Sequence, residues 1–228
     1  MEGVPVERYQ DVAVALQRLG RSWWLWVLLS QATVTYGHVL LVVVLPVRLA
    51  LGAYVALALV RLAEVLPGTE ARQLQGLAVL AGLATLVNVS GSALGGRSSA
   101  ASTASVAIAL VGLVLFARVM RSFTAHEPRT VTVVETWDRA IRWGSVAVAA
   151  LLVGCLIALP ALALTSGLHA DHAVRGVVAG IGAVCAIAGI GALFTVARGT
   201  RWTRMAFGEG PDTLWHGPIV PGPHPPSA

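Results

Sequence analysis

A histidine, a tyrosine and an asparagine interrupt apolar parts of the chain at matching positions. His38 and Tyr54 lie about two helical turns before and after Pro46, and Asn88 lies about two turns before the end of the apolar segment 73–95. If Pro46 marks a turn between two helices, the three side chains lie at one depth. Imidazole, phenol and amide groups bind polar ligands, and histidine also titrates near neutral pH. The spacing therefore predicts a polar cavity around His38, Tyr54 and Asn88.

Two more polar residues extend this predicted cavity. Gln31, Thr35 and His38 follow at i, i+4 and i+7 spacing, which places them on one face of a helix. Polar groups in an apolar environment are costly unless they are hydrogen-bonded or hydrated. Two interpretations stay open: the residues line a ligand cavity, or they hydrogen-bond to one another and only hold helices together.

A second cluster consists of His169, Asp171 and His172, close together in the sequence. Imidazole and carboxylate groups are ligands of zinc and copper, so the cluster is a candidate metal site. A fourth ligand is not evident, and such triplets occur often by chance. The sequence also contains no phosphate-binding loop, zinc-protease motif or G-x-S-x-G motif. We therefore predict no catalytic residue and no cofactor, with the metal site as a minor alternative.

The composition places these residues in a membrane protein. The chain has 228 residues, of which 56% are hydrophobic and 12% are charged, and its mean hydropathy is +0.76. Soluble domains carry about 25% charged residues. Several segments of about 20 residues contain almost no charge, which is the length that crosses a bilayer as a helix. The predicted fold class is an all-α, polytopic transmembrane helix bundle.

The apolar segments divide into six predicted spans. As a single helix, residues 23–66 would be roughly 66 Å long, about twice the hydrocarbon thickness, so this segment must turn. Pro46 interrupts helical hydrogen bonding, and Arg48 reaches the headgroups from a hairpin tip, so the turn is predicted at Pro46. The spans are 23–44, 47–66, 73–95, 100–117, 143–165 and 173–197. The alternative is one span over about 38–60, with Arg48 near its centre.

The distribution of arginine predicts the orientation. All 16 basic residues are arginines, they oppose 11 acidic residues, and the net charge is +5. Six spans with both termini in the cytoplasm leave only Arg48, Arg97 and Arg175 outside, in agreement with the positive-inside rule, whereas five spans leave basic residues on both sides. Arginine without lysine is typical of GC-rich bacterial genomes, which indicates a bacterial plasma membrane. The arginines are scattered, so nucleic-acid binding is not expected.

The two ends of the chain are predicted to lie outside the transmembrane domain, which covers residues 23–197. Residues 1–22 contain Val12, Leu16 and Leu19 at helical spacing, which predicts an amphipathic helix on the membrane surface. A plain lead-in helix is the alternative. Residues 198–228 are rich in glycine and proline and are predicted to form a disordered cytoplasmic tail.

Glycines recur in the last predicted span at Gly176, Gly180, Gly182 and Gly189. Small residues at such spacing let helix backbones approach closely. These glycines therefore predict a packing face, either inside the bundle or between two copies of the chain. The alternative is that glycine is simply common in this composition.

An amphipathic helix followed by six spans resembles the membrane half of some ABC exporters, which would imply a separate ATPase partner, although the inner loop 67–72 is shorter than the coupling helix of that family. The sequence predicts a small integral membrane protein that is a transport component or an accessory subunit of a membrane complex, with the polar cavity in the outer half of the membrane. Its expected partners are the lipid bilayer and a membrane protein, an ATPase or a second copy. A structural or regulatory protein without a ligand pathway is one alternative, and a metal-dependent membrane enzyme is another.

Overall fold

The computed structural model describes residues 10–20, 41–66, 68–93, 99–126, 130–164 and 172–208. These residues form helices and short turns and contain no β-strand, which confirms the all-α fold class. The helices are residues 10–20, α2 (Leu41–Val65), α3 (Gly68–Ala93), α4 (Ser99–His126), the short 3-10 helix η3 (Val131–Val133), α5 (Val134–Leu164) and α6 (His172–Gly208).

Four segments are long and apolar enough to cross a membrane: Leu45–Val65, Thr103–His126, Val131–Ile157 and Gly176–Gly208. The chain is thus compatible with a membrane protein of several spans. Helix α3 is not among these four segments. Glu70 and Arg72 lie in its first turns and lower the hydropathy there. The first predicted span, 23–44, lies almost entirely outside the described residues. The count of six spans therefore stays a prediction.

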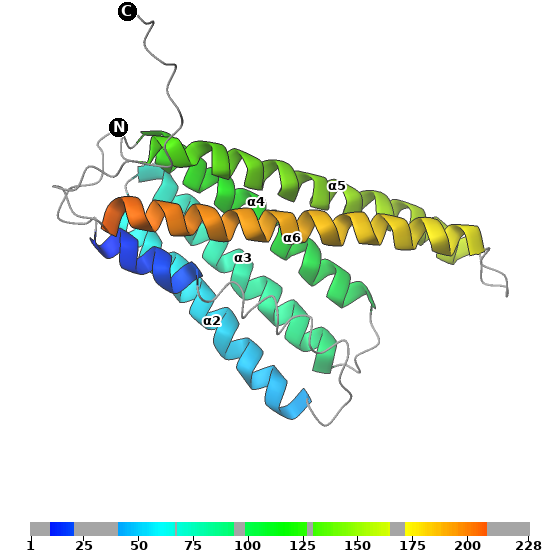
Figure 1. Cartoon of the computed structure of the whole chain (residues 1–228). Helices are drawn as coiled ribbons and strands as arrows, with labels where there is room; N and C mark the ends of the chain where they lie inside the picture. The colour runs from blue at the N-terminus through cyan, green and yellow to red at the C-terminus, as the bar shows by residue number, and fades with distance from the viewer. Residues whose placement is uncertain are drawn as a thin grey trace, which may run out of the picture.

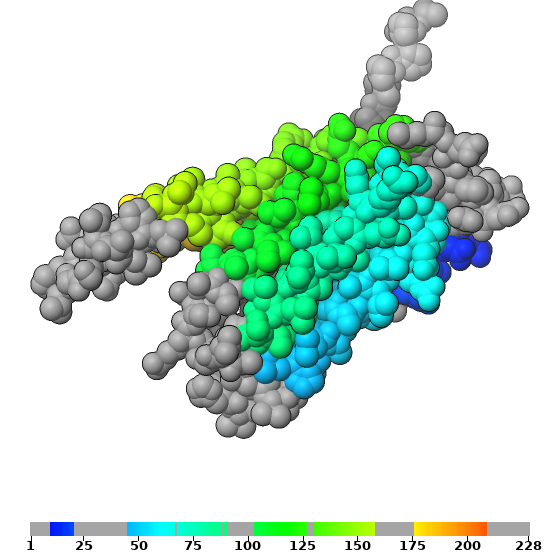
Figure 2. Space-filling view, turned by 180° about the vertical axis from the view of Figure 1, so that it is seen from behind, coloured from blue at the N-terminus to red at the C-terminus, as the bar shows by residue number. Residues whose placement is uncertain are grey.

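Consecutive helices pack as neighbours from α2 to α6, and α4 also contacts α6. Figure 1 shows that successive helices in this series run antiparallel to one another along the bundle. Away from the end where α6 finishes, α2, α3 and α4 diverge from α5 and α6. Figure 2, seen from behind, shows the same separation, with α2, α3 and α4 side by side in one layer.

Helix α2 is continuous through Pro46, so the predicted turn at this residue is wrong. Pro46 follows the helix start at Leu41 by little more than one turn. Its missing N–H therefore removes only the hydrogen bond to the carbonyl of Val42, close to an end where the helix is least constrained. Arg48 was predicted to lie at a hairpin tip. It lies within the same helix instead, and it is only 5% exposed.

Most of the buried side chains gather at one end of the bundle, which we call the packed end. It comprises residues 10–20, 52–66, 68–78, 113–126, 130–147 and 188–208. Aromatic pairs join distant segments there: Phe116 lies edge-on to Trp137 with ring centroids 5.9 Å apart, and Phe123 stacks on Phe207 at 5.6 Å. Beyond the packed end, α5 and α6 expose large apolar side chains such as Leu156 and Ile187, as lipid-facing helices do.

Helix α6 ends later than predicted. It continues to Gly208, so the disordered tail predicted from residue 198 is wrong for residues 198–208. Thr203 and Phe207 are fully buried in this extension. Packing against the rest of the bundle therefore extends the helix beyond the point where its hydropathy falls. Residues 209–228 lie outside the described residues.

The helix over residues 10–20 packs against the protein. Val12, Leu16 and Leu19 are at most 1% exposed and belong to the buried core. Figure 1 shows this helix beside the last turns of α6. A Cβ atom placed on Gly208 would lie 3.9 Å from the Cβ of Ala13. Residues near the start and near the end of the chain thus meet at the packed end.

This contact predicts a cross-link. Cβ atoms 3.5–4.5 Å apart are suited to a disulfide. In a variant with Cys155 and Cys185 replaced by alanine, the pair Ala13→Cys and Gly208→Cys should form an intramolecular disulfide when membranes are oxidised with copper phenanthroline. Faster migration on a non-reducing gel, reversed by dithiothreitol, would report the disulfide.

The control combines Ala13→Cys with Gly176→Cys, near the other end of α6. At 1.5 Å per residue this cysteine lies about 48 Å along the helix from position 208, so no cross-link should form. Equal cross-linking of both pairs, or of neither, would contradict the arrangement of residues 10–20 beside the end of α6.

Candidate functional site at the packed end

The structure describes the side chain of one predicted cavity residue, Tyr54. This tyrosine is 43% exposed, on the α2 face that also exposes Ala53 and Leu57. It therefore points away from the buried face of α2. His38, Gln31 and Thr35 lie outside the described residues. Asn88 lies on α3, but its side chain is outside the described part. Because α2 continues through Pro46, the turn that was expected to bring His38 and Tyr54 to one depth is absent. The polar cavity itself stays a prediction.

The candidate metal residues lie largely outside the described part of the chain. His169 and Asp171 precede α6, and His172 is its first residue, with its side chain outside the described set. Among the side chains that are described, no group of three histidine, cysteine, aspartate or glutamate residues comes together. The metal site therefore also stays a prediction.

The predicted glycine face has few neighbours among the described residues. A Cβ atom on Gly176, Gly180 or Gly182 would meet no atom of the described structure within 4 Å, and one on Gly189 would lie 3.6 Å from Leu110. In this stretch the close approach of α5 to α6 involves a glycine of α5 instead, because a Cβ on Gly154 would lie 3.2 Å from Cγ2 of Ile181.

A Cβ on Gly191 would lie 3.0 Å from the Trp143 ring, and one on Gly199 would lie 2.9 Å from the Trp137 ring. These two glycines therefore let tryptophans of α5 approach the backbone of α6. The small-xxx-small spacing did not single them out. In the sequence, only the presence of tryptophans in one apolar segment and glycines in the next could have indicated these contacts.

A groove of about 710 Å³ lies between the helix over residues 10–20 and the last turns of α6. Such a volume is within the usual range of ligand sites. The helix over residues 10–20 contributes Leu16 and Gln17, and α6 contributes Phe194, Arg198, Arg201 and Arg204. The sequence did not predict this groove, because Arg198, Arg201 and Arg204 were assigned to a disordered tail.

The groove is strongly basic. Its three arginines follow at intervals of three residues, and its described lining contains no aspartate or glutamate. Arg198 lies over the indole of Trp202, with the guanidinium carbon 5.9 Å from the ring centroid, which is a cation–π contact. Arg198 and Arg201 are exposed, and Arg204 is half-buried. This arrangement can bind an anion, because guanidinium groups donate several hydrogen bonds to phosphate or carboxylate oxygens.

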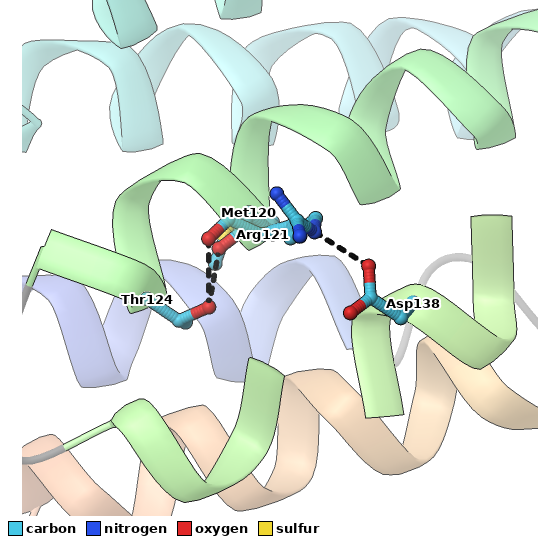
Figure 3. A network of polar contacts seen from close by, with 4 residues as sticks. All are labelled: Met120, Arg121, Thr124 and Asp138. Carbon is cyan, nitrogen blue, oxygen red and sulfur yellow. Dashed lines mark hydrogen bonds and ion pairs between the residues drawn. The ribbon is translucent and has the colours of Figure 1, made fainter. Parts of the chain in front are cut away.

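Polar contacts also join the helices of the packed end. Figure 3 shows the ion pair between Arg121 of α4 and Asp138 of α5. On the same stretch of α4, the Thr124 hydroxyl donates to the carbonyl of Met120 at 2.8 Å. The Thr130 hydroxyl, directly before η3, donates to the Thr124 carbonyl at 3.1 Å and so connects the start of η3 to the end of α4.

Glu70 joins α3 to α4. It is 8% exposed, and its two carboxylate oxygens accept hydrogen bonds from the hydroxyls of Thr69 and Ser122, each at 3.0 Å. Burial alone would raise the pKa of Glu70, but its backbone N–H, the hydroxyls of Ser122 and Thr69 and the charge of His126 outweigh burial and lower the pKa below its ordinary value. The carboxylate is therefore held in its charged form.

Glu70→Gln should lower the free energy of unfolding by about 1.5 kcal/mol at neutral pH, because hydrogen bonds to a charged group are lost. Since folding lowers the pKa, this contribution is complete above the unfolded pKa of about 4.3 and is lost as the pH falls through the folded pKa. Thermal unfolding of both proteins in detergent between pH 3 and 7 measures the difference.

Glu64→Gln is the matched control. Glu64 pairs with Arg61 in an exposed contact, and such pairs contribute little to stability. Its effect should be small at every pH. A Glu70→Gln effect that stays constant down to pH 3 would contradict the role of the charged carboxylate.

Comparisons with protein-family models, with curated proteins and with solved structures find no match to this chain.

Proposed function

We propose that the protein is a non-catalytic accessory subunit of a complex in the bacterial plasma membrane and that the packed end is its docking surface. One observation carries this proposal: the buried core lies at the arginine-rich end of the bundle. Helices that only cross a bilayer need no core concentrated at one end. A rigid end suits a docking surface, because its side chains lose little conformational entropy when a partner binds.

Contacts between helices make this end rigid. The ion pair of Arg121 with Asp138 and the hydrogen bond of Ser122 to Glu70 connect α4 to its two neighbours. The Phe123 and Phe207 rings connect α4 to α6. Side chains on this end are therefore held in fixed relative positions.

Exposed arginines lie on the outer surface of the packed end. Arg118 of α4 and Arg142 of α5 are exposed, and neither takes part in an ion pair within the described residues. Exposed charges of one sign steer association with an oppositely charged partner. An acidic surface of a membrane or peripheral protein is the kind of partner that would fit.

The test compares two double variants of the full chain. Arg118→Glu with Arg142→Glu reverses the charge, and Arg118→Lys with Arg142→Lys keeps it. Tagged protein is cross-linked in native membranes, extracted in mild detergent and purified, and associated proteins are quantified. A partner retained by wild type and the lysine variant but lost with the glutamate variant is the expected result. Recovery of the same proteins with all three chains would refute the docking role.

A transport component is the second candidate. Arg48 favours it, because this arginine is 5% exposed within the candidate span Leu45–Val65, and charged side chains inside a span often mark an ion or substrate pathway. His38→Cys tests this candidate with a membrane-impermeant thiol reagent added from outside. Labelling would support a water-filled cavity, whereas complete protection would favour residues that only hold helices together.

A further inference from the structure

We infer that the groove between the helix over residues 10–20 and α6 is a binding site for an anionic phospholipid. This inference is independent of the docking role. The groove has an apolar half and a basic half, as a lipid with a negative headgroup has. Among the described residues that line it, no carboxylate competes for the arginines.

The apolar half lies toward the middle of α6. Phe194 and Ala197 line the groove there, and Phe194 is 62% exposed. Phe194 also lies well within the apolar segment Gly176–Gly208. An acyl chain against Phe194 would cover apolar surface that the described residues leave open.

The basic half begins about one helical turn later. Arg201 lies seven residues beyond Phe194 and Arg204 ten residues beyond it, so they stand about 10 and 15 Å further along the helix. Over this distance the groove would extend from the hydrocarbon region, at Phe194, to the headgroup region, at the arginines, where a lipid phosphate lies. Trp202 is beside the arginines, and tryptophan is typical of this interface.

The charges favour an anionic over a zwitterionic lipid. Three arginines line the groove, whereas one phosphate carries one negative charge. The choline group of phosphatidylcholine would place a further positive charge near them. Phosphatidylglycerol carries no such cation, and juxtamembrane arginines attract anionic headgroups.

The experiment titrates full-length protein in a neutral detergent with dioctanoyl phosphatidylglycerol and follows the melting temperature. A ligand that binds only the folded protein raises this temperature with concentration. Dioctanoyl phosphatidylcholine should raise it much less. Arg201→Gln with Arg204→Gln should weaken phosphatidylglycerol binding roughly 30-fold, from the usual contribution of an interfacial arginine.

Arg118→Gln with Arg142→Gln is the matched control, because it removes the same charge from the packed end outside the groove. It should leave phosphatidylglycerol affinity at the wild-type level. Should the groove variant fail to fold, Phe194→Gln, at an exposed position, should weaken binding through the apolar half. Arg201→Lys with Arg204→Lys should retain most of the affinity, because the charge remains.

Three results would overturn the inference. One is equal stabilisation by the two lipids, and a second is equal loss of affinity in the groove variant and its control. The third is full competition by inorganic phosphate at the same concentration, which would indicate a site for free anions that makes no use of Phe194.

Discussion

Replacing Trp137 with alanine is expected to lower the free energy of unfolding by about 3–5 kcal/mol, the usual cost of removing a large aromatic residue from a core. Trp137 is fully buried and is the largest side chain in the core. It contacts Phe116 of α4 edge-on, and its ring packs against Gly199 of α6. Its removal would leave a cavity where three helices meet. Thermal unfolding in detergent, followed by circular dichroism, measures the loss.

Two variants separate packing from other effects of this substitution. The indole Nε1 of Trp137 has no hydrogen-bond partner within the described structure, so Trp137→Phe sacrifices no hydrogen bond and should cost clearly less than alanine. Trp143→Ala changes the same residue type on the same helix, but Trp143 is 44% exposed. Its cost should also be smaller. Equal losses for Trp137→Ala and Trp143→Ala would contradict a core centred on Trp137.

The central parts of α2 to α6 could be predicted from the sequence. The predicted spans from 47–66 to 173–197 each overlap one observed helix over most of their length. Long apolar segments without charge have few alternatives to a helix, because backbone polar groups must be satisfied within the segment. Hydropathy therefore predicted which residues are helical without knowledge of their neighbours.

The ends of these helices could not be predicted, because tertiary contacts determine them. Helix α4 continues to His126 and α6 to Gly208, in regions where arginine lowers the hydropathy. The stacked rings of Phe123 and Phe207 stabilise both extensions. These two residues are far apart in the sequence, and no local pattern pairs them.

The basic groove depends on the same kind of long-range contact. Arg198, Arg201 and Arg204 were predicted to lie in a disordered tail, and the sequence did not pair them with Leu16 and Gln17 of the helix over residues 10–20. A site made by two segments from opposite ends of the chain has no spacing that a motif could report. The Pro46 turn failed for a different reason: a proline close to a helix start removes a single hydrogen bond and does not end the helix.

Gly52→Ala is expected to lower the free energy of unfolding by about 1–3 kcal/mol through overpacking. A Cβ atom on Gly52 would lie 2.8 Å from the Cβ of Thr85 on α3 and closer still to its Oγ1 and Cγ2. Thr85 is 6% exposed, and its hydroxyl donates to the Ala81 carbonyl at 2.8 Å. A β-branched side chain held in this way cannot rotate out of contact. The helices α2 and α3 would have to move apart.

Thr85→Gly should rescue Gly52→Ala, because it removes all three atoms that the new methyl group meets. The double variant should then be more stable than the two separate losses predict, by at least about 1 kcal/mol of coupling in a double-mutant cycle. Gly82→Ala is the control on α3, since a Cβ there meets no atom of the described residues within 4 Å, and it should be neutral or slightly stabilising. Strictly additive losses at positions 52 and 85 would mean that α2 and α3 are not in the close contact that Gly52 permits.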